Sequence, residues 1–193
     1  MDKKEEKYRQ KDILNAGVAG ASYEAVQRYG EAAKQHYVAY SGVDHESGKT
    51  LAKGLKQIAD EKVNPDYKYQ NTHQQAGFSA EVKDTARTNA EHIIHGDPVR
   101  KSRTDDLGRV NDPLHDTVML DRNGNIIDGS GAQMKFLGAS EKDPAGKEAA
   151  SRALEKLQSK KFEKYLEKDV KIEVPSDQYD QIMQEAEKKI ERL

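Results

Sequence analysis

Amide and charged side chains gather at one end of a predicted β-hairpin that spans residues 116–135. After a short apolar run, Asn123-Gly124 gives the strongest two-residue turn signal, and a further strand is predicted over residues 132–137. Alternation along that strand places Gln133 and Lys135 on the same face, next to apolar neighbours. A lysine is unusual beside apolar neighbours unless it has a functional role. A hairpin of this kind can hold a metal site.

The arrangement resembles the PD-(D/E)XK nuclease superfamily. The family motif is an Asp at the start of one strand, followed on the next strand by an acidic residue or Gln, a spacer and a Lys. Here Asp116 is followed by Gln133-Met134-Lys135. The family also draws a Glu from the helix that precedes the sheet, and Glu81 has that place in the chain order. Gln133 stands where a carboxylate is commoner, which leaves one fewer negative charge to hold a metal.

The resemblance implies metal-dependent hydrolysis of phosphodiester bonds in DNA or RNA, with DNA as the first expectation. Mg²⁺ or Mn²⁺ would be bound by Asp116 and Gln133, with Glu81 as an accessory ligand. Lys135 would orient the attacking water or stabilise the pentavalent phosphorus. All four residues are therefore expected in the catalytic site. The biological settings that the resemblance implies are host defence, mobile elements, DNA repair and toxin domains.

Each of these residues also has a structural explanation. Asp116 can simply begin a strand, Lys135 can be a solvated edge residue that deters aggregation, and Glu81 can be favoured by the dipole of its helix. The alternative function is therefore a non-catalytic protein-interaction module on a nuclease-like scaffold, which would bind another protein through N-terminal helices.

The first third of the chain is predicted to be helical. Apolar and tyrosine side chains recur at helical spacing up to residue 63, and Gly17, Gly20 and Gly30 are expected to break the helix. One helix is predicted to end at Ser41-Gly42 and a second to span residues 51–63. The polar stretch 65–75 is typical of a linker, so we predict a helical annex over residues 1–70 and an α/β domain over residues 71–193.

The predicted α/β domain begins with a helix whose N-cap is Ser79. A strand near residues 99–104 and the two strands of the hairpin follow, then a helix, a strand and a final helix. The bounds of these last three are residues 144–167, 170–174 and 175–193. The αβββαβ order is the one that the resemblance requires. The predicted fold class is thus α/β, with a restriction-endonuclease-like core behind an N-terminal helical annex.

The composition limits the function. The 193 residues are 35% apolar and 34% charged, with a mean hydropathy of −0.99 and a net charge of −2, so any contact with nucleic acid must come from local basic patches. Arg100, Lys101 and Arg103 are one candidate patch. The absence of cysteine excludes thiolate chemistry, and no apolar run is long enough to span a membrane. We expect a cytoplasmic protein with no membrane partner, although an effector domain of a longer secreted chain would look the same.

Overall fold

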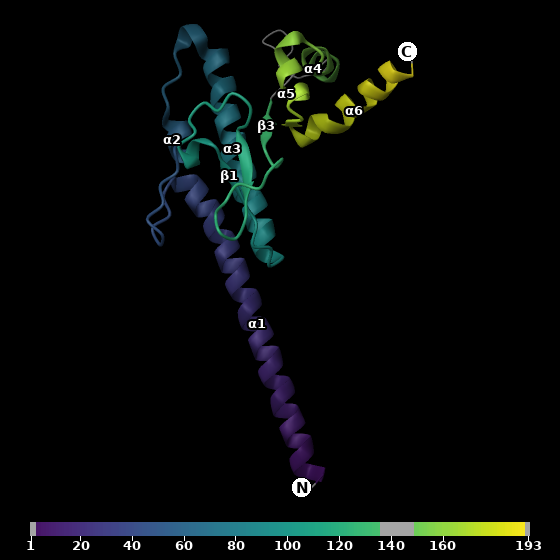
Figure 1. Cartoon of the computed structure of the whole chain (residues 1–193). Coiled ribbons are helices and arrows are strands. Elements are labelled where there is room, and N and C mark those ends of the chain that lie inside the picture. Colours follow the sequence, from purple (N-terminus) through teal and green to yellow (C-terminus); the bar gives the residue numbers. More distant parts are fainter. Residues whose placement is uncertain (1–2, 136–148, 192–193) are drawn as a thin grey trace.

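The computed structural model describes residues 3–135 and 149–191 and shows a mixed α/β protein with a long helical N-terminal region and a small four-stranded sheet (Figure 1). The predicted order of helix, three strands, helix, strand and helix is confirmed, except that the middle helix is divided in two. Within the described parts, no helix combines the length and apolar character needed to cross a membrane.

Helix α1 (Lys3–Ser41) is one continuous helix of 39 residues. The predicted breaks at its glycines are wrong, because a glycine inside a helix costs only about 1 kcal/mol relative to alanine and neighbouring turns can offset that. The first half of α1 projects from the rest of the protein, and the second half lies against α3 (Figure 1). The predicted end is confirmed, and Gly42 follows in the left-handed region with φ +76°.

The predicted linker is wrong, since residues 65–75 are helical. A short 3₁₀ turn, η1 (Pro65–Tyr67), leads directly into α3 (Lys68–Ile94). Asn64 caps this turn by accepting a hydrogen bond from the Asp66 backbone N–H at 3.0 Å. Ser79 is therefore an interior residue of α3 and not its N-cap.

Helix α2 (Leu55–Asp60) is shorter than the predicted helix over residues 51–63, because a small hairpin occupies the chain before it. Its buried Ile58 packs with Ala39 of α1 and with Val82 and Ala86 of α3. This apolar cluster joins the three helices, and the predicted boundary between residues 70 and 71 falls inside α3.

The sheet has the order β1-β2-β3-β4. Strands β1 (Arg100–Arg103), β2 (Thr117–Leu120) and β3 (Ala132–Met134) are antiparallel neighbours, and β4 (Lys171–Glu173) is parallel to β3. The turn predicted at Asn123-Gly124 is confirmed, with Gly124 at φ +81° and an isolated bridge joining Leu120 to Ile126. Residues 136 and 137 of the predicted strand lie outside the described residues.

Three helices make up the C-terminal part. They are α4 (Ala149–Leu157), α5 (Lys160–Glu167) and α6 (Ser176–Ile190). The single helix predicted over residues 144–167 is divided at Ser159, whose hydroxyl donates back to the Lys156 carbonyl at 2.6 Å. Residues 144–148 of that prediction lie outside the described residues. A second apolar cluster fills the space between these helices and β4, formed by Ala150, Ala153, Phe162, Tyr165, Val170 and Ile182 with Ile172 against them.

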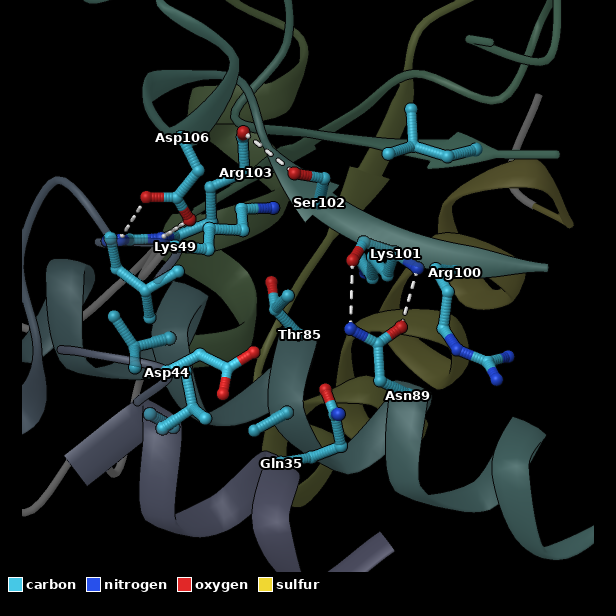
Figure 2. A pocket seen from close by; sticks show the side chains of 16 residues that line it. Gln35, Asp44, Lys49, Thr85, Asn89, Arg100, Lys101, Ser102, Arg103 and Asp106 are labelled. Carbon is cyan, nitrogen blue, oxygen red and sulfur yellow. Dashed lines mark hydrogen bonds and ion pairs between the residues drawn. The ribbon is translucent and has the colours of Figure 1, made fainter. Parts of the chain in front are cut away.

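Helix α3 closes the open edge of the sheet at β1. The Asn89 amide lies beside Lys101, donates to its backbone carbonyl at 3.0 Å and accepts from its backbone N–H at 2.7 Å (Figure 2). One turn further along α3, a ring nitrogen of His92 is 2.9 Å from the Val99 carbonyl oxygen. Side chains of a helix thus satisfy backbone groups that an additional strand would otherwise pair with.

Candidate functional site

Asp116 is the residue immediately before β2 and is fixed from two sides. Its backbone N–H donates to the Ala132 carbonyl at 2.8 Å, and one of its carboxylate oxygens accepts from the Met134 backbone N–H at 2.8 Å. The side chain therefore reaches across to β3 at the level of the motif that was predicted to act with it.

Gln133 and Lys135 both act on this carboxyl group. Gln133 is only 3% exposed, and a hydrogen bond from its side chain lowers the pKa of Asp116. The positive charge of Lys135 lowers the pKa of Asp116 more strongly and also lowers that of Glu81. The lysine is held in place by its backbone N–H, which donates to the Glu173 carbonyl of β4 at 2.8 Å.

Glu81 of α3 completes the group of predicted residues. Its pKa is raised from 4.5 to about 7, first by burial and then by repulsion from the charge of Asp116. Burial likewise raises the pKa of Asp116, although Lys135, the Met134 N–H and Gln133 oppose the change. Two carboxyl groups in one poorly solvated place each favour the protonated form. The structure therefore brings together all four residues singled out in the sequence.

Two further charged residues, Arg103 and Asp105, belong to this environment and were not predicted. Arg103 lowers the pKa of Glu81, whereas Asp105 raises that of both Glu81 and Asp116. The signal that could have identified them is the run Arg103-Thr-Asp-Asp106, which places opposite charges next to one another shortly before the Asp116 strand.

The predicted basic patch at residues 100–103 is wrong for two of its three residues. Arg103 is 2% exposed and forms two bonds of 2.8 Å to the Asp106 carboxylate, which is also buried. Lys101 is buried as well and is bound to carboxylates. Both cations are neutralised inside the protein, so neither is available to nucleic acid on the surface.

The donor types present, carboxylates and an amide, are those that a hard divalent cation prefers. In the described parts of the chain, no group of three or more His, Cys, Asp and Glu side chains is arranged to hold a metal ion. Mg²⁺, however, commonly takes one or two carboxylates and keeps several waters. Asp116 and Glu81 supply two carboxylates and Gln133 an amide oxygen. Burial, the largest cause, raises the pKa of both carboxyl groups, and a cation bound beside them would favour their ionised forms.

A separate cavity of about 240 Å³ lies between α1, α3, β1 and the hairpin over residues 42–54 (Figure 2). Asp106 and Arg103 form part of its wall, whereas the four predicted site residues do not line it. The buried hydroxyl of Thr85, which also lines this cavity, has no hydrogen-bond partner. The cavity thus lies behind the buried Arg103–Asp106 pair and is not the place where the carboxylates meet.

Comparison of the chain with protein-family models, with curated proteins and with solved structures finds no match. Any function assigned to the site must therefore rest on the residues themselves, their surroundings and the order of the elements that carry them.

Proposed function

We propose that the protein is a metal-dependent nuclease that hydrolyses phosphodiester bonds in nucleic acid. The observation that carries this proposal is the meeting of Glu81, Asp116, Gln133 and Lys135 at one end of the sheet, from three segments well separated in the sequence. Carboxyl groups that can hold a divalent cation and an ammonium group that can stabilise negative charge on the phosphate suit such a reaction.

The arrangement of the strands supports a restriction-endonuclease-like core for this proposal. A helix with the acidic residue precedes three antiparallel strands, and a helical connection then leads to a fourth strand parallel to the third. Asp116 comes just before β2, Gln133 lies in β3 and Lys135 follows β3 directly, an order that matches the family that the sequence resembles.

Within this proposal, Asp116, Glu81 and the Gln133 amide oxygen hold Mg²⁺ or Mn²⁺. When bound, the cation supplies positive charge to the scissile phosphate and makes a water molecule more acidic. Asp116 is suited to its role because the Met134 N–H and the strand pairing fix its carboxylate. Its orientation therefore requires no rearrangement when the substrate binds.

Lys135 stabilises the negative charge that develops on the phosphate oxygens. Its ammonium group acts on both carboxyl groups, so it lies within electrostatic reach of any phosphate that they help to hold. An ammonium group in a poorly solvated site stabilises such charge more than it would in water. The substrate is DNA or RNA, and we place the activity in the cytoplasm because a chain without cysteine suits a reducing compartment.

The proposal is tested by incubating the purified protein with single- and double-stranded DNA and RNA in the presence of Mg²⁺, Mn²⁺ or EDTA. We expect cleavage that requires the divalent ion and falls by on the order of a hundredfold in Asp116→Ala. Asp128→Ala, which removes an exposed carboxylate from the nearby hairpin, should cleave like the wild type. Cleavage of no substrate with either ion, or equal cleavage by both variants, would overturn the proposal.

A second candidate function, a protein-interaction module, is favoured by the surface of α1. Tyr8, Val18, Val26 and Tyr29 are each at least 60% exposed, and helical geometry places them on one side of the helix. Exposed tyrosines and valines in one stripe are typical of a surface that packs against a helix of another protein. Calorimetric titration with Mn²⁺ separates the candidates, because an interaction module should bind the ion no better than Asp116→Ala does.

A further inference from the structure

A groove of about 420 Å³ adjoins the candidate site and shares Lys135 with it. Its walls are α3 on one side and the ends of β3 and β4 with the start of α6 on the other. The volume is within the range of roughly 300–1,000 Å³ that small-molecule sites occupy. A ligand in this groove could therefore contact Lys135 of the candidate site.

The acidic residues of the groove are partly neutralised. Asp84 and Glu173 both line it, and both are bound by the Lys101 ammonium, at 2.5 Å and 2.7 Å. Burial alone would lower the pKa of Lys101, but the two carboxylates raise it above the ordinary value, so the lysine stays charged. The single Lys101 ammonium thus offsets one of the two negative charges and reduces the repulsion that an anion would meet.

The cations of the groove, by contrast, are available. Among the described residues, neither Lys83 nor Lys135 forms a salt bridge, although the charge of Lys135 also acts on the carboxyl groups of the candidate site. Arg87 pairs only with the exposed Glu91 on its own helix. A flexible exposed pair of this kind is worth little and can be exchanged for another anion. The groove is thus lined by three cations, Lys83 and Arg87 from α3 and Lys135 from the end of β3.

The remaining lining of the groove is apolar. Ala80 comes from α3, Met134 from β3, and Val174 and Pro175 from the segment between β4 and α6. An apolar surface of this kind binds the flat face of a nucleobase, whereas a phosphate requires the cations around it. Both kinds of contact are therefore present within one nucleotide-sized space.

We propose that the groove holds one unstacked nucleotide next to the bond that is cut. Its base lies against Met134, Val174 and Pro175, and its phosphate lies between Lys83 and Lys135. A base in a duplex remains stacked and paired and cannot enter, so the substrate is single-stranded nucleic acid. This inference rests on the proposed nuclease function, because that function makes Lys135 part of a cleavage site. Binding of a nucleotide in the groove can nevertheless be measured without cleavage.

The test measures binding of fluorescein-labelled ten-nucleotide DNA and RNA single strands, and of the matching duplexes, by anisotropy in EDTA. We expect the single strands to bind at least about tenfold more tightly than the duplexes. Lys83→Ala should weaken binding about five- to tenfold and reduce its salt dependence by roughly one phosphate contact. Lys68→Ala, which removes an exposed lysine from the same helix, is the matched control and should bind normally.

Ala80→Leu fills the groove without removing charge, and circular dichroism verifies that the variant is folded. It should reduce the affinity for single strands by about tenfold and leave weak duplex binding unchanged. Duplexes that bind as tightly as single strands, or wild-type affinity in both Lys83→Ala and Ala80→Leu, would overturn the proposed groove.

Measuring cleavage alongside binding distinguishes failure of the proposed nucleotide groove from failure of the proposed nuclease function. Selective binding of single strands without cleavage would refute the nuclease proposal and support the nucleotide groove. If Lys83→Ala and Ala80→Leu both cleave with wild-type KM, the nuclease proposal stands and the nucleotide groove is refuted. When both proposals hold, Lys83→Ala raises KM for single strands and leaves kcat unchanged.

Discussion

Glu81→Gln should make the metal-free protein more stable at pH 8. The pKa of Glu81 is raised to about 7 in the folded protein, whereas a carboxyl group in the unfolded chain titrates near 4.5. Between these values the folded state binds a proton that the unfolded state has lost. The free energy of unfolding must therefore fall as the pH rises from about 4.5 to 7 and stay reduced above that. A neutral amide of nearly the same shape avoids this loss.

The magnitude follows from the size of the shift. At 1.36 kcal/mol per pKa unit, a change from 4.5 to about 7 sets a ceiling of roughly 3 kcal/mol. Glu81 is only half-buried, so solvent screens part of the repulsion from Asp116. We therefore expect Glu81→Gln to raise the free energy of unfolding by about 1–2 kcal/mol at pH 8 and to change it little at pH 4.5.

The measurement is urea unfolding at both pH values in EDTA, with Glu91→Gln as the control. Glu91 lies on the same helix but is exposed and paired only with Arg87, so its change should stay within about 0.5 kcal/mol at either pH. Added Mg²⁺ should stabilise the wild type more than Glu81→Gln, because the variant lacks one proposed ligand. A gain in stability that is the same at pH 4.5 and pH 8 would refute the electrostatic origin of the effect.

Three further predictions concern the site and its support. Lys135→Ala should lower kcat for cleavage by on the order of a hundredfold in a protein that circular dichroism shows to be folded, whereas Lys171→Ala on the neighbouring strand should have wild-type kinetics. Gln133→Glu should tighten Mg²⁺ binding by about tenfold or more in calorimetry, since a carboxylate binds the ion better than an amide, and equal or undetectable binding would remove Gln133 from the ligand set. Asp106→Ala should cost about 3–5 kcal/mol in urea unfolding because it leaves the Arg103 charge buried and unpaired, and a loss below 1 kcal/mol would show that water reaches that arginine.

The parts of the fold that the sequence predicted well depend on local chemistry. Asn123-Gly124 forms its turn because a glycine can adopt a positive φ there, and the dipeptide alone is enough to predict that turn. The residue types at 116, 133 and 135 likewise pointed to one place, because strand pairing brings the start of β2 next to β3.

The parts that were missed depend on partners distant in the chain. Lys101 and Arg103 look like surface cations in the sequence. Lys101, however, is bound by Glu173, 72 residues away, and the Arg103 guanidinium donates to the backbone carbonyl of Lys53, 50 residues away. The start of α3 was placed too late because the polar residues 68–75 form no apolar stripe. Their helix is an extension of the part that packs through Val82 and Ala86.

The way α3 closes the edge of β1 also has a consequence for the order of folding. Asn89 and Lys101 are separated by 12 residues, whereas Lys101 and Glu173 are separated by 72. Contacts between near neighbours form with less loss of chain entropy, so α3, β1 and β2 are expected to make an early unit to which β4 and α6 are added later. Amide hydrogen exchange should therefore be slower in β1 than in β4. The wall of the groove would then open in partial unfolding events that leave Asp116 and Glu81 in place.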